Sequence, residues 1–179
     1  MGQEISALIT NQQLEIDREI VHFAAQECTI IPLDIDPAHV EYFVTQAAQF
    51  DRLEDLLLHL EMKDGSDWDN GSNADIYGDG PCQHTLTTVI SWIRSMQLQH
   101  FILEYYSDFA SQAMDCYFVL VLNGNIVKKS VMIGDYGIDW DAYVDFTQQL
   151  GVDHYWYCDE TKYFRYSNAE EVYRSQQGR

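Results

Sequence analysis

The residues of this chain that could hold a metal are concentrated between Asp64 and Asp75, where aspartate, asparagine and serine recur in a glycine-rich segment. Hard cations such as Ca²⁺ take roughly six to eight oxygen ligands, which these side chains could supply. The spacing does not match an EF-hand: counted from Asp67, Gly71 and Ser72 occupy a ligand position and the glycine position, and Gly78 replaces the closing glutamate. We therefore expect no metal site, because turns capped by Asp and Asn side chains explain the segment more simply. An unconventional Ca²⁺ or Mg²⁺ site stays open as an alternative.

A second candidate for chemistry is the pair Cys82 and His84, just before an expected helix. The potential at a helix N-terminus lowers a thiol pKa, so the pair could form a nucleophile, and with Asp75 or Asp79 it could bind zinc. The spacing supports neither, because no second matched Cys/His pair and no C-x-x-C sequence occurs. Motifs of nucleotide-binding loops, serine hydrolases and zinc proteases are also missing from the sequence. We expect no catalytic residue, no cofactor and four free cysteines in a reducing compartment.

Charge is the strongest signal in the composition. The 179 residues include 29 Asp plus Glu and only 10 Lys plus Arg, a formal net charge of -19. No Lys or Arg occurs from Asp64 to Ile93 or from Ser130 to Thr161. Such a charge attracts cationic partners and repels phosphates, so a basic protein is a favourable partner and nucleic acid an unfavourable one. A generally acidic, salt-adapted proteome is the other source of such acidity, and the 13% of aromatic residues argue against it.

The first half of the chain predicts strands and helices in alternation. Ile5 to Thr10 and Cys28 to Leu33 have the apolar, β-branched composition of strands, and a helix from about Gln12 to Gln26 would make a β-α-β opening. Asp36-Pro37 predicts a helix start. Another helix is expected from Asp51 to about Met62, with Glu54 completing a capping box.

The second half predicts a meander and further helices. After a helix over Thr85 to Met96, three strands of an antiparallel meander span Phe101 to Ile133, with Asn123-Gly124 as the hairpin turn between the second and third. A helix begins at Asp139 and ends near Gly151. An aromatic hairpin over Tyr155 to Tyr166 follows, and a last helix starts at Ser167, with Glu170 completing a capping box.

These elements predict an α+β protein with an antiparallel sheet, helices packed on it, and a single acidic domain over residues 1–179. An irregular loop is expected at about 63–84. The amino terminus shows neither a secretory signal nor a membrane span, so we expect a cytoplasmic protein without a membrane partner.

The helix that begins at Asp51 predicts a binding surface. Its leucines at 53, 56, 57 and 60 fall on one side at helical spacing, and its acids fall on the other, with Leu58 and Met62 among them. An apolar pair within an acidic face suits a partner that is attracted by charge and anchored by apolar contact. The alternative is that a neighbouring loop covers Leu58. On a helix, Asp51 with Asp55 and Asp141 with Asp145 would lie about 6 Å apart and could imitate neighbouring phosphates.

We therefore predict an acidic binding protein that neutralises a basic partner such as a nuclease or another nucleic-acid-binding enzyme. In charge and size it is similar to small acidic inhibitors, including immunity proteins and DNA mimics, although no motif is shared. The alternatives are a metal-binding domain or hydrolase built on loop 64–84, and a domain with an ordinary small-molecule pocket. The residues expected to contact the partner are Asp51, Glu54, Asp55, Leu58, Glu61, Met62, Asp64, Asp67, Trp68, Asp69, Asp75, Tyr77, Asp79, Asp141 and Asp145.

Overall fold

The computed structural model describes residues 3–25, 27–63, 82–109, 112–127, 131–134, 140–151 and 166–178. Its strands form one seven-stranded sheet in the order β2-β3-β1-β4-β5-β6, and β7 also pairs with β5. All these pairings are antiparallel. The strands are β1 (Gln3–Thr10), β2 (Phe23–Ala25), β3 (Cys28–Pro32), β4 (Phe101–Phe109), β5 (Gln112–Leu122), β6 (Asn125–Ile126) and β7 (Val131–Gly134).

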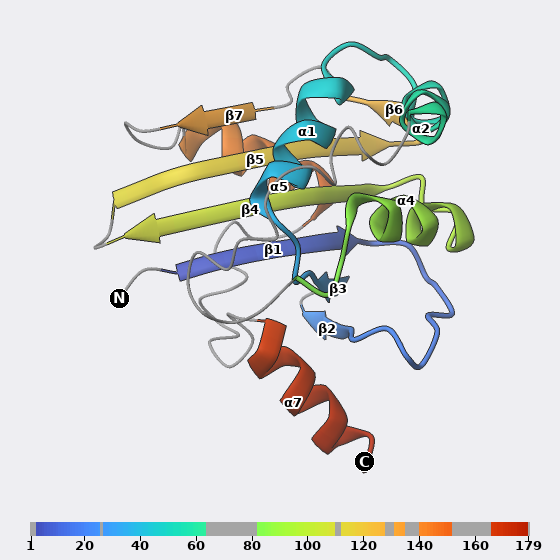
Figure 1. The fold of residues 1–179 in the computed structure, drawn as a ribbon, viewed down its shortest axis with the longest axis vertical. Coiled ribbons are helices and arrows are strands. Elements are labelled where there is room, and N and C mark those ends of the chain that lie inside the picture. The colour runs from blue at the N-terminus through green and yellow to red at the C-terminus, as the bar shows by residue number, and fades with distance from the viewer. Residues whose placement is uncertain are drawn as a thin grey trace.

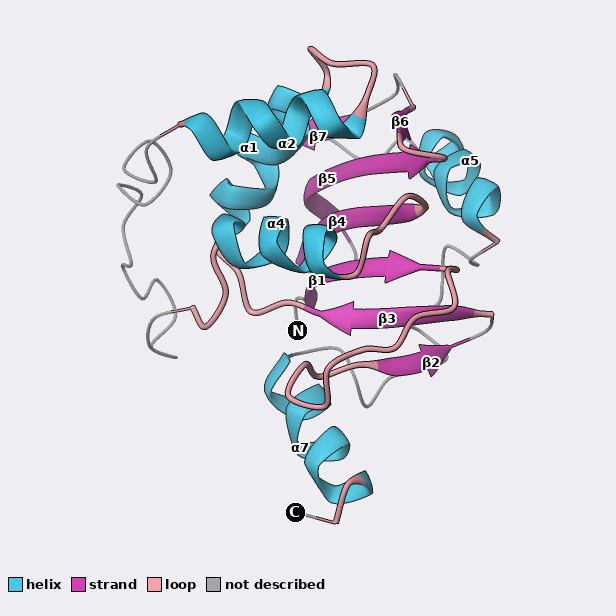
Figure 2. Cartoon of the chain, turned by 90° about the vertical axis from the view of Figure 1, so that its right-hand side faces the viewer, coloured by secondary structure: helices cyan, strands magenta, loops and turns pink. Residues whose placement is uncertain are grey.

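Helices cover both faces of this sheet (Figures 1 and 2). They are α1 (Pro37–Ala47), α2 (Leu53–Met62), α4 (Leu86–Ser95), α5 (Trp140–Leu150) and α7 (Tyr166–Gln176). Figure 2 shows α1, α2 and α4 together on one side of the sheet and α5 on the other. The described residues thus form a single α+β domain with an antiparallel sheet, which confirms the predicted fold class.

Alternating strand residues divide the interior into two cores. Successive side chains of a strand point to opposite faces. Leu8 and Leu103, paired across β1 and β4, pack under α1, α2 and α4, whereas the neighbouring pair Ile9 and Ile102 packs with α5 and α7. The central strands are apolar on both faces because each face is covered.

The β-α-β opening predicted from the sequence is wrong. Residues 11–22 form no helix, and β1 pairs antiparallel with β3. Side chains from Asn11 to Asp17 instead alternate between exposed and half-buried, the pattern of an extended chain. The side chain of Gln12 holds this segment in place, because its Oε1 accepts hydrogen bonds from the backbone N–H groups of Gln99 and His100.

The start of α2 also differs from the expected capping box at Asp51. The helix begins at Leu53, and the structure shows no capping hydrogen bond from the side chain of Arg52, the N-cap residue. The backbone here bonds to the β5–β6 hairpin: the carbonyl of Asp51 accepts from the N–H of Ile126, and the N–H of Leu53 donates to the carbonyl of Gly124, each over 2.9 Å. These long-range bonds to the hairpin replace the local cap.

Other local predictions are confirmed. Asp36 caps α1 by accepting from the N–H of Ala38 at 2.9 Å, with Pro37 at the first helical position. Thr85 caps α4. Asn123 and Gly124 adopt φ values of 51° and 70°, as the hairpin prediction requires.

Two C-terminal predictions need correction or lie beyond the described chain. The expected strand Ile126–Ile133 is divided between the short strands β6 and β7, which both pair with β5. Most of the aromatic hairpin falls on residues 152–165, outside the described residues, and Tyr166 belongs to α7 rather than to a strand. The final helix therefore starts one residue before the expected cap at Ser167.

Candidate functional site

The outward side of α2 presents an exposed apolar pair beside carboxylates, as the sequence predicts. Leu58 is 48% exposed and Met62 is 82% exposed, and they are the exposed large hydrophobic residues of the described chain. The leucines at 53, 56, 57 and 60 are buried against the sheet and α1. Asp55, three residues before Leu58, is exposed. We call Asp55, Leu58 and Met62 the α2 outer face; Leu58 is not covered as the alternative required.

Arg94 of α4 binds two of the acids predicted for this surface. Its Nε and Nη2 donate to the two carboxylate oxygens of Glu61 over 3.0 and 2.9 Å, and its Nη1 donates to Glu54 over 2.5 Å. This bidentate contact holds the pKa of Glu61 below its ordinary value and raises that of Arg94. Glu54 and Glu61 therefore fasten α2 to α4, whereas the exposed carboxylate of Asp55 lies outside these ion pairs.

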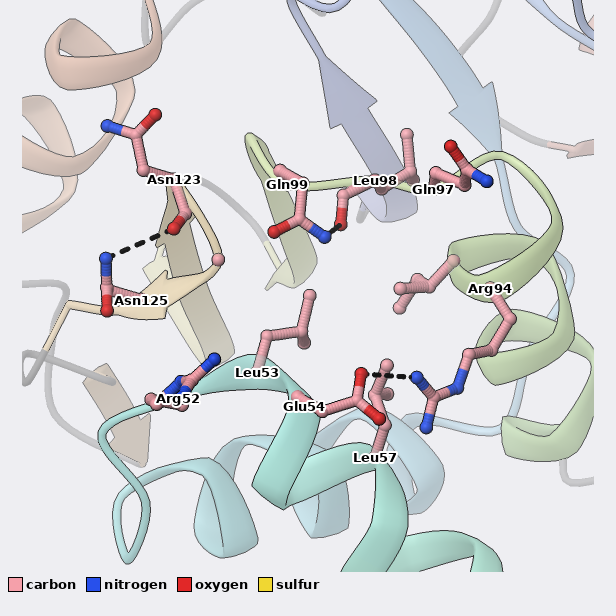
Figure 3. A pocket seen from close by; sticks show the side chains of 12 residues that line it. Arg52, Leu53, Glu54, Leu57, Arg94, Gln97, Leu98, Gln99, Asn123 and Asn125 are labelled. Atoms are coloured by element: carbon pink, nitrogen blue, oxygen red, sulfur yellow. Dashed lines mark hydrogen bonds and ion pairs between the residues drawn. The ribbon is translucent and has the colours of Figure 1, made fainter.

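A hollow of about 850 Å³ lies beside this ion pair, between the start of α2, the end of α4 and the β5–β6 turn. We call it the hairpin hollow; Figure 3 shows Gln97, Gln99, Asn123 and Asn125 around it, with the Glu54–Arg94 pair at its edge. Gln97 and Asn123 have positive φ values of 52° and 51°. The described lining of the hairpin hollow has neither Cys nor Ser nor His, and its carboxylate, Glu54, is bound to Arg94. The hollow can form hydrogen bonds, and this lining contains no nucleophile or free acid–base pair.

His84, the histidine of the predicted Cys82–His84 pair, makes structural hydrogen bonds to Asp34, while Asp75 and Asp79 of the zinc alternative lie outside the described residues. His84 is buried, its Nδ1 accepts a 2.9 Å hydrogen bond from the backbone N–H of Asp34, and the backbone N–H of His84 donates to the carbonyl of Asp34 over 2.8 Å. Burial lowers the pKa of His84, against the opposing charges of Asp34 and Glu170. His84 thus joins the start of α4 to the end of β3 as a neutral structural residue, while Cys82 is exposed.

The other predicted site residues lie either outside the described residues or on α5. Asp64, Asp67, Trp68, Asp69, Asp75, Tyr77 and Asp79 lie outside the described residues, as does most of the loop on which the metal or hydrolase alternative depends. Within the described chain, no group of three His, Cys, Asp or Glu residues is arranged for a metal ion. Asp141 and Asp145 are on α5, on the opposite side of the sheet from α2 (Figure 2).

The proposed imitation of phosphates by Asp51 and Asp55 loses its geometric basis. Asp51 precedes α2, so the two carboxylates are not successive positions of one helix. Asp141 and Asp145 do lie four residues apart on α5, and Asp145 is exposed. Of the predicted acids that the structure describes, those on α2 and those on α5 therefore lie on separate surfaces.

The sequence interpretation missed three exposed acids next to α4. Glu15, Asp17 and Glu19 lie on the extended segment that was expected to be a helix. The signal that could have found them is the alternation from Asn11 to Asp17, where polar outward residues interleave with Gln12, Leu14 and Ile16. That two-residue period places Glu15 and Asp17 on the same side of an extended chain.

Comparison with family models, with curated proteins and with solved structures finds no match to this chain. Across the described residues, no helix is long and apolar enough to pass through a bilayer.

Proposed function

We propose that the protein acts by stoichiometric binding of a basic protein partner, such as a nuclease or another nucleic-acid-binding enzyme. The observation that carries this proposal is the imbalance of exposed charge. Among side chains whose exposure is described, the exposed cations are Arg18, Arg52 and Arg174. The exposed carboxylates are Glu54 and Glu61, which pair with the half-buried Arg94, and Glu15, Asp17, Glu19, Glu27, Glu41, Asp51, Asp55, Asp145 and Glu171.

The α2 outer face supports the proposal by providing an anchor within this acidic surface. Leu58 and Met62 are one helical turn apart, so their side chains are neighbours. Exposed apolar groups that become desolvated on binding supply most of the affinity of a typical interface, while surrounding charges raise the association rate and exclude wrong partners. Leu58 and Met62 would therefore hold a partner that the carboxylates attract.

The ion pairs of Arg94 make this surface rigid before binding. Glu54 and Glu61 are seven residues apart on α2, and one guanidinium on α4 binds both. A surface whose helices are already fixed loses less conformational entropy when a partner binds. This arrangement favours binding of a preformed partner surface over folding on contact.

The proposal is tested by using the tagged protein as bait in a lysate of its source cells and measuring the association rate of the captured partner. We expect a basic partner whose association rate falls at least tenfold between about 50 and 500 mM NaCl, as in electrostatic steering. The double variant Leu58→Ser/Met62→Ser should weaken affinity 10- to 100-fold, about 1.4–2.8 kcal/mol.

The matched control is Gln176→Ser/Gln177→Ser, two exposed residues at the end of α7. It should leave affinity within twofold. Because Leu58 and Met62 are exposed, their substitution should change the free energy of unfolding by less than about 0.5 kcal/mol. A partner that is not basic, or an association rate indifferent to salt, contradicts the proposal.

A further inference from the structure

A second hollow, of about 480 Å³, lies on the other side of α4 from α2. The segment between β1 and β2 forms one wall, where it passes the end of α4 (Figure 1). We call this the acidic hollow. Its described lining combines three carboxylates with an apolar floor: Glu15, Asp17, Glu19, Ile20, Trp92, Ser95 and Met96.

Hydrogen bonds at several points hold the carboxylate wall. Gln12 ties its start to the backbone of Gln99 and His100. Near its end, Tyr173 of α7 donates to the carbonyl of Arg18 over 2.7 Å. Between these points, the carboxylate of Asp17 accepts from the N–H of Glu19 at 3.0 Å. The acids are therefore presented from a fixed backbone.

The apolar wall is held equally firmly. Trp92 lies on α4 and Met96, four residues later, is its C-cap residue. At about 100° per residue, both lie on the flank opposite Arg94. The ring of Trp92 contacts the buried ring of His84, with centroids 5.0 Å apart in an edge arrangement. Ile20, Trp92 and Met96 pack against the core below them while remaining part of the hollow.

This combination fits a long side chain with an apolar stem and a cationic head. The stem of arginine packs on apolar surface, its planar guanidinium stacks on an indole, and its N–H groups bind carboxylates in pairs. Arg94 shows the same chemistry within this molecule, where one guanidinium joins Glu54 and Glu61. The described lining of the acidic hollow offers three carboxylates, and its other side chains are apolar or neutral.

We infer that the acidic hollow receives an arginine side chain of the basic partner. This inference rests on the proposed function and specifies how that partner is recognised. The two flanks of α4 then take guanidinium groups from different sources: Arg94 of the chain itself fills the α2 side, and an arginine of the partner fills the side of Trp92. Binding of this arginine in the acidic hollow would fix the position of the partner on the acidic surface.

The test uses the peptide acetyl-Gly-Arg-Gly-Arg-Gly-amide at low salt, with lysine and citrulline versions beside it. Citrulline keeps the shape of arginine and removes its charge. The readouts are calorimetric affinity and the NMR shift of the Trp92 indole N–H, assigned with Trp92→Phe. We expect the arginine peptide to move this resonance, the lysine peptide to bind at least threefold more weakly, and the citrulline peptide not to bind.

Two charge-matched variants separate the hollow from the general acidity of the surface. Glu15→Gln/Asp17→Asn/Glu19→Gln should lower affinity for the arginine peptide at least tenfold, and the amide introduced at position 17 can still accept from the N–H of residue 19. The control Glu27→Gln/Glu41→Gln/Glu171→Gln removes the same charge from exposed residues elsewhere and should keep affinity within twofold.

Equal losses in both variants, equal binding of the lysine peptide, or an unmoved Trp92 resonance would overturn the arginine site. The lysate capture tests the proposed function independently of the arginine site, because the Leu58→Ser/Met62→Ser variant leaves the acidic hollow intact. If a basic partner is captured with salt-dependent kinetics and the hollow variant binds it normally, the inference fails while the proposed function stands.

Discussion

His84 shows at the scale of one residue how burial converts a chemically suggestive side chain into a structural one. The N–H of Asp34 donates to its Nδ1, which requires that nitrogen to be unprotonated. The pKa of His84 is lowered from its ordinary 6.5, mainly by burial. In the unfolded chain the same ring takes up a proton near that ordinary value.

Because the unfolded state binds the proton more tightly, His84 makes stability fall as pH drops below about 6.5. The free energy of unfolding should decrease by up to about 1.4 kcal/mol per pH unit until the folded-state ring also protonates. Urea unfolding at pH 7.0, 6.0 and 5.0 measures this slope. Between pH 7.0 and 5.0, the free energy of unfolding of His84→Asn should change less with pH than that of the wild type. The amide oxygen of the asparagine can accept from the N–H of Asp34 without titrating.

His59→Asn is the control for this pH profile. His59 is half-buried on α2, with its Nε2 3.0 Å from the side-chain oxygen of Gln46. Its replacement should leave the His84-dependent slope in place. A wild-type profile that is flat from pH 7 to 5 would show that His84 tolerates protonation in the fold.

At the scale of elements, the β5–β6 turn connects the meander to two helices. The N–H of Gly124 donates to the carbonyl of Gln99, and its carbonyl accepts from Leu53, the first residue of α2. Gly124 has φ +70°, and a Cβ there would lie 2.3 Å from Oε1 of Gln99, at the end of a flexible side chain. The cost of a side chain at this position is therefore mainly that of the left-handed backbone.

We expect Gly124→Ala to lower the free energy of unfolding by about 1–2 kcal/mol, the cost of a left-handed conformation for an L-residue. Asn123→Gly should change it much less, because glycine adopts φ 51° without strain. Chemical denaturation of both variants makes the comparison. If Gly124→Ala were as stable as the wild type, residue 124 would not need a left-handed backbone, and the predicted cost would be wrong.

The segment 11–22 shows why an element can be misread while its neighbours are predicted correctly. Leu14, Ile16 and Ile20 fit a loosely amphipathic helix, and Leu14 and Ile16 also fit a period of two. The structure selects the extended form, because Gln12 satisfies backbone groups at 99 and 100 and the three apolar side chains pack on the core below α4. Gln99 and His100 lie more than 80 residues after Gln12, so the local sequence does not indicate these hydrogen bonds.

At the scale of the whole molecule, the net charge of -19 opposes compaction. Ion pairs in the described chain, such as Arg94 with Glu54 and Glu61, are few beside the exposed carboxylates. Screening should therefore weaken repulsion more than it weakens attraction. Among the described residues, exposed carboxylates lie on both sides of the sheet, for example Asp55 on α2 and Asp145 on α5.

We expect the melting temperature to rise by several degrees between about 10 and 150 mM NaCl, and equally in KCl. A change of 1 kcal/mol corresponds to roughly 2–4 °C for a domain of this size. Scanning calorimetry across this range is the measurement. A melting temperature that falls with salt would show that the carboxylates are mostly paired, and would remove the physical basis of the proposed function.

The sequence by itself determined the α+β class, the start of α1 at Pro37, the extent of α4 and the Asn123-Gly124 turn. These follow from signals within a few residues: caps, helical or strand periodicity, and residues that accept positive φ. Only the tertiary structure decided that Arg94 binds Glu54 and Glu61, 40 and 33 residues away, and that 11–22 is extended. It also decided that the acids of α2 and α5 lie on opposite sides of the sheet. Each of these depends on which distant segments pack together. The local sequence does not indicate whether an acidic side chain faces solvent or pairs with an arginine.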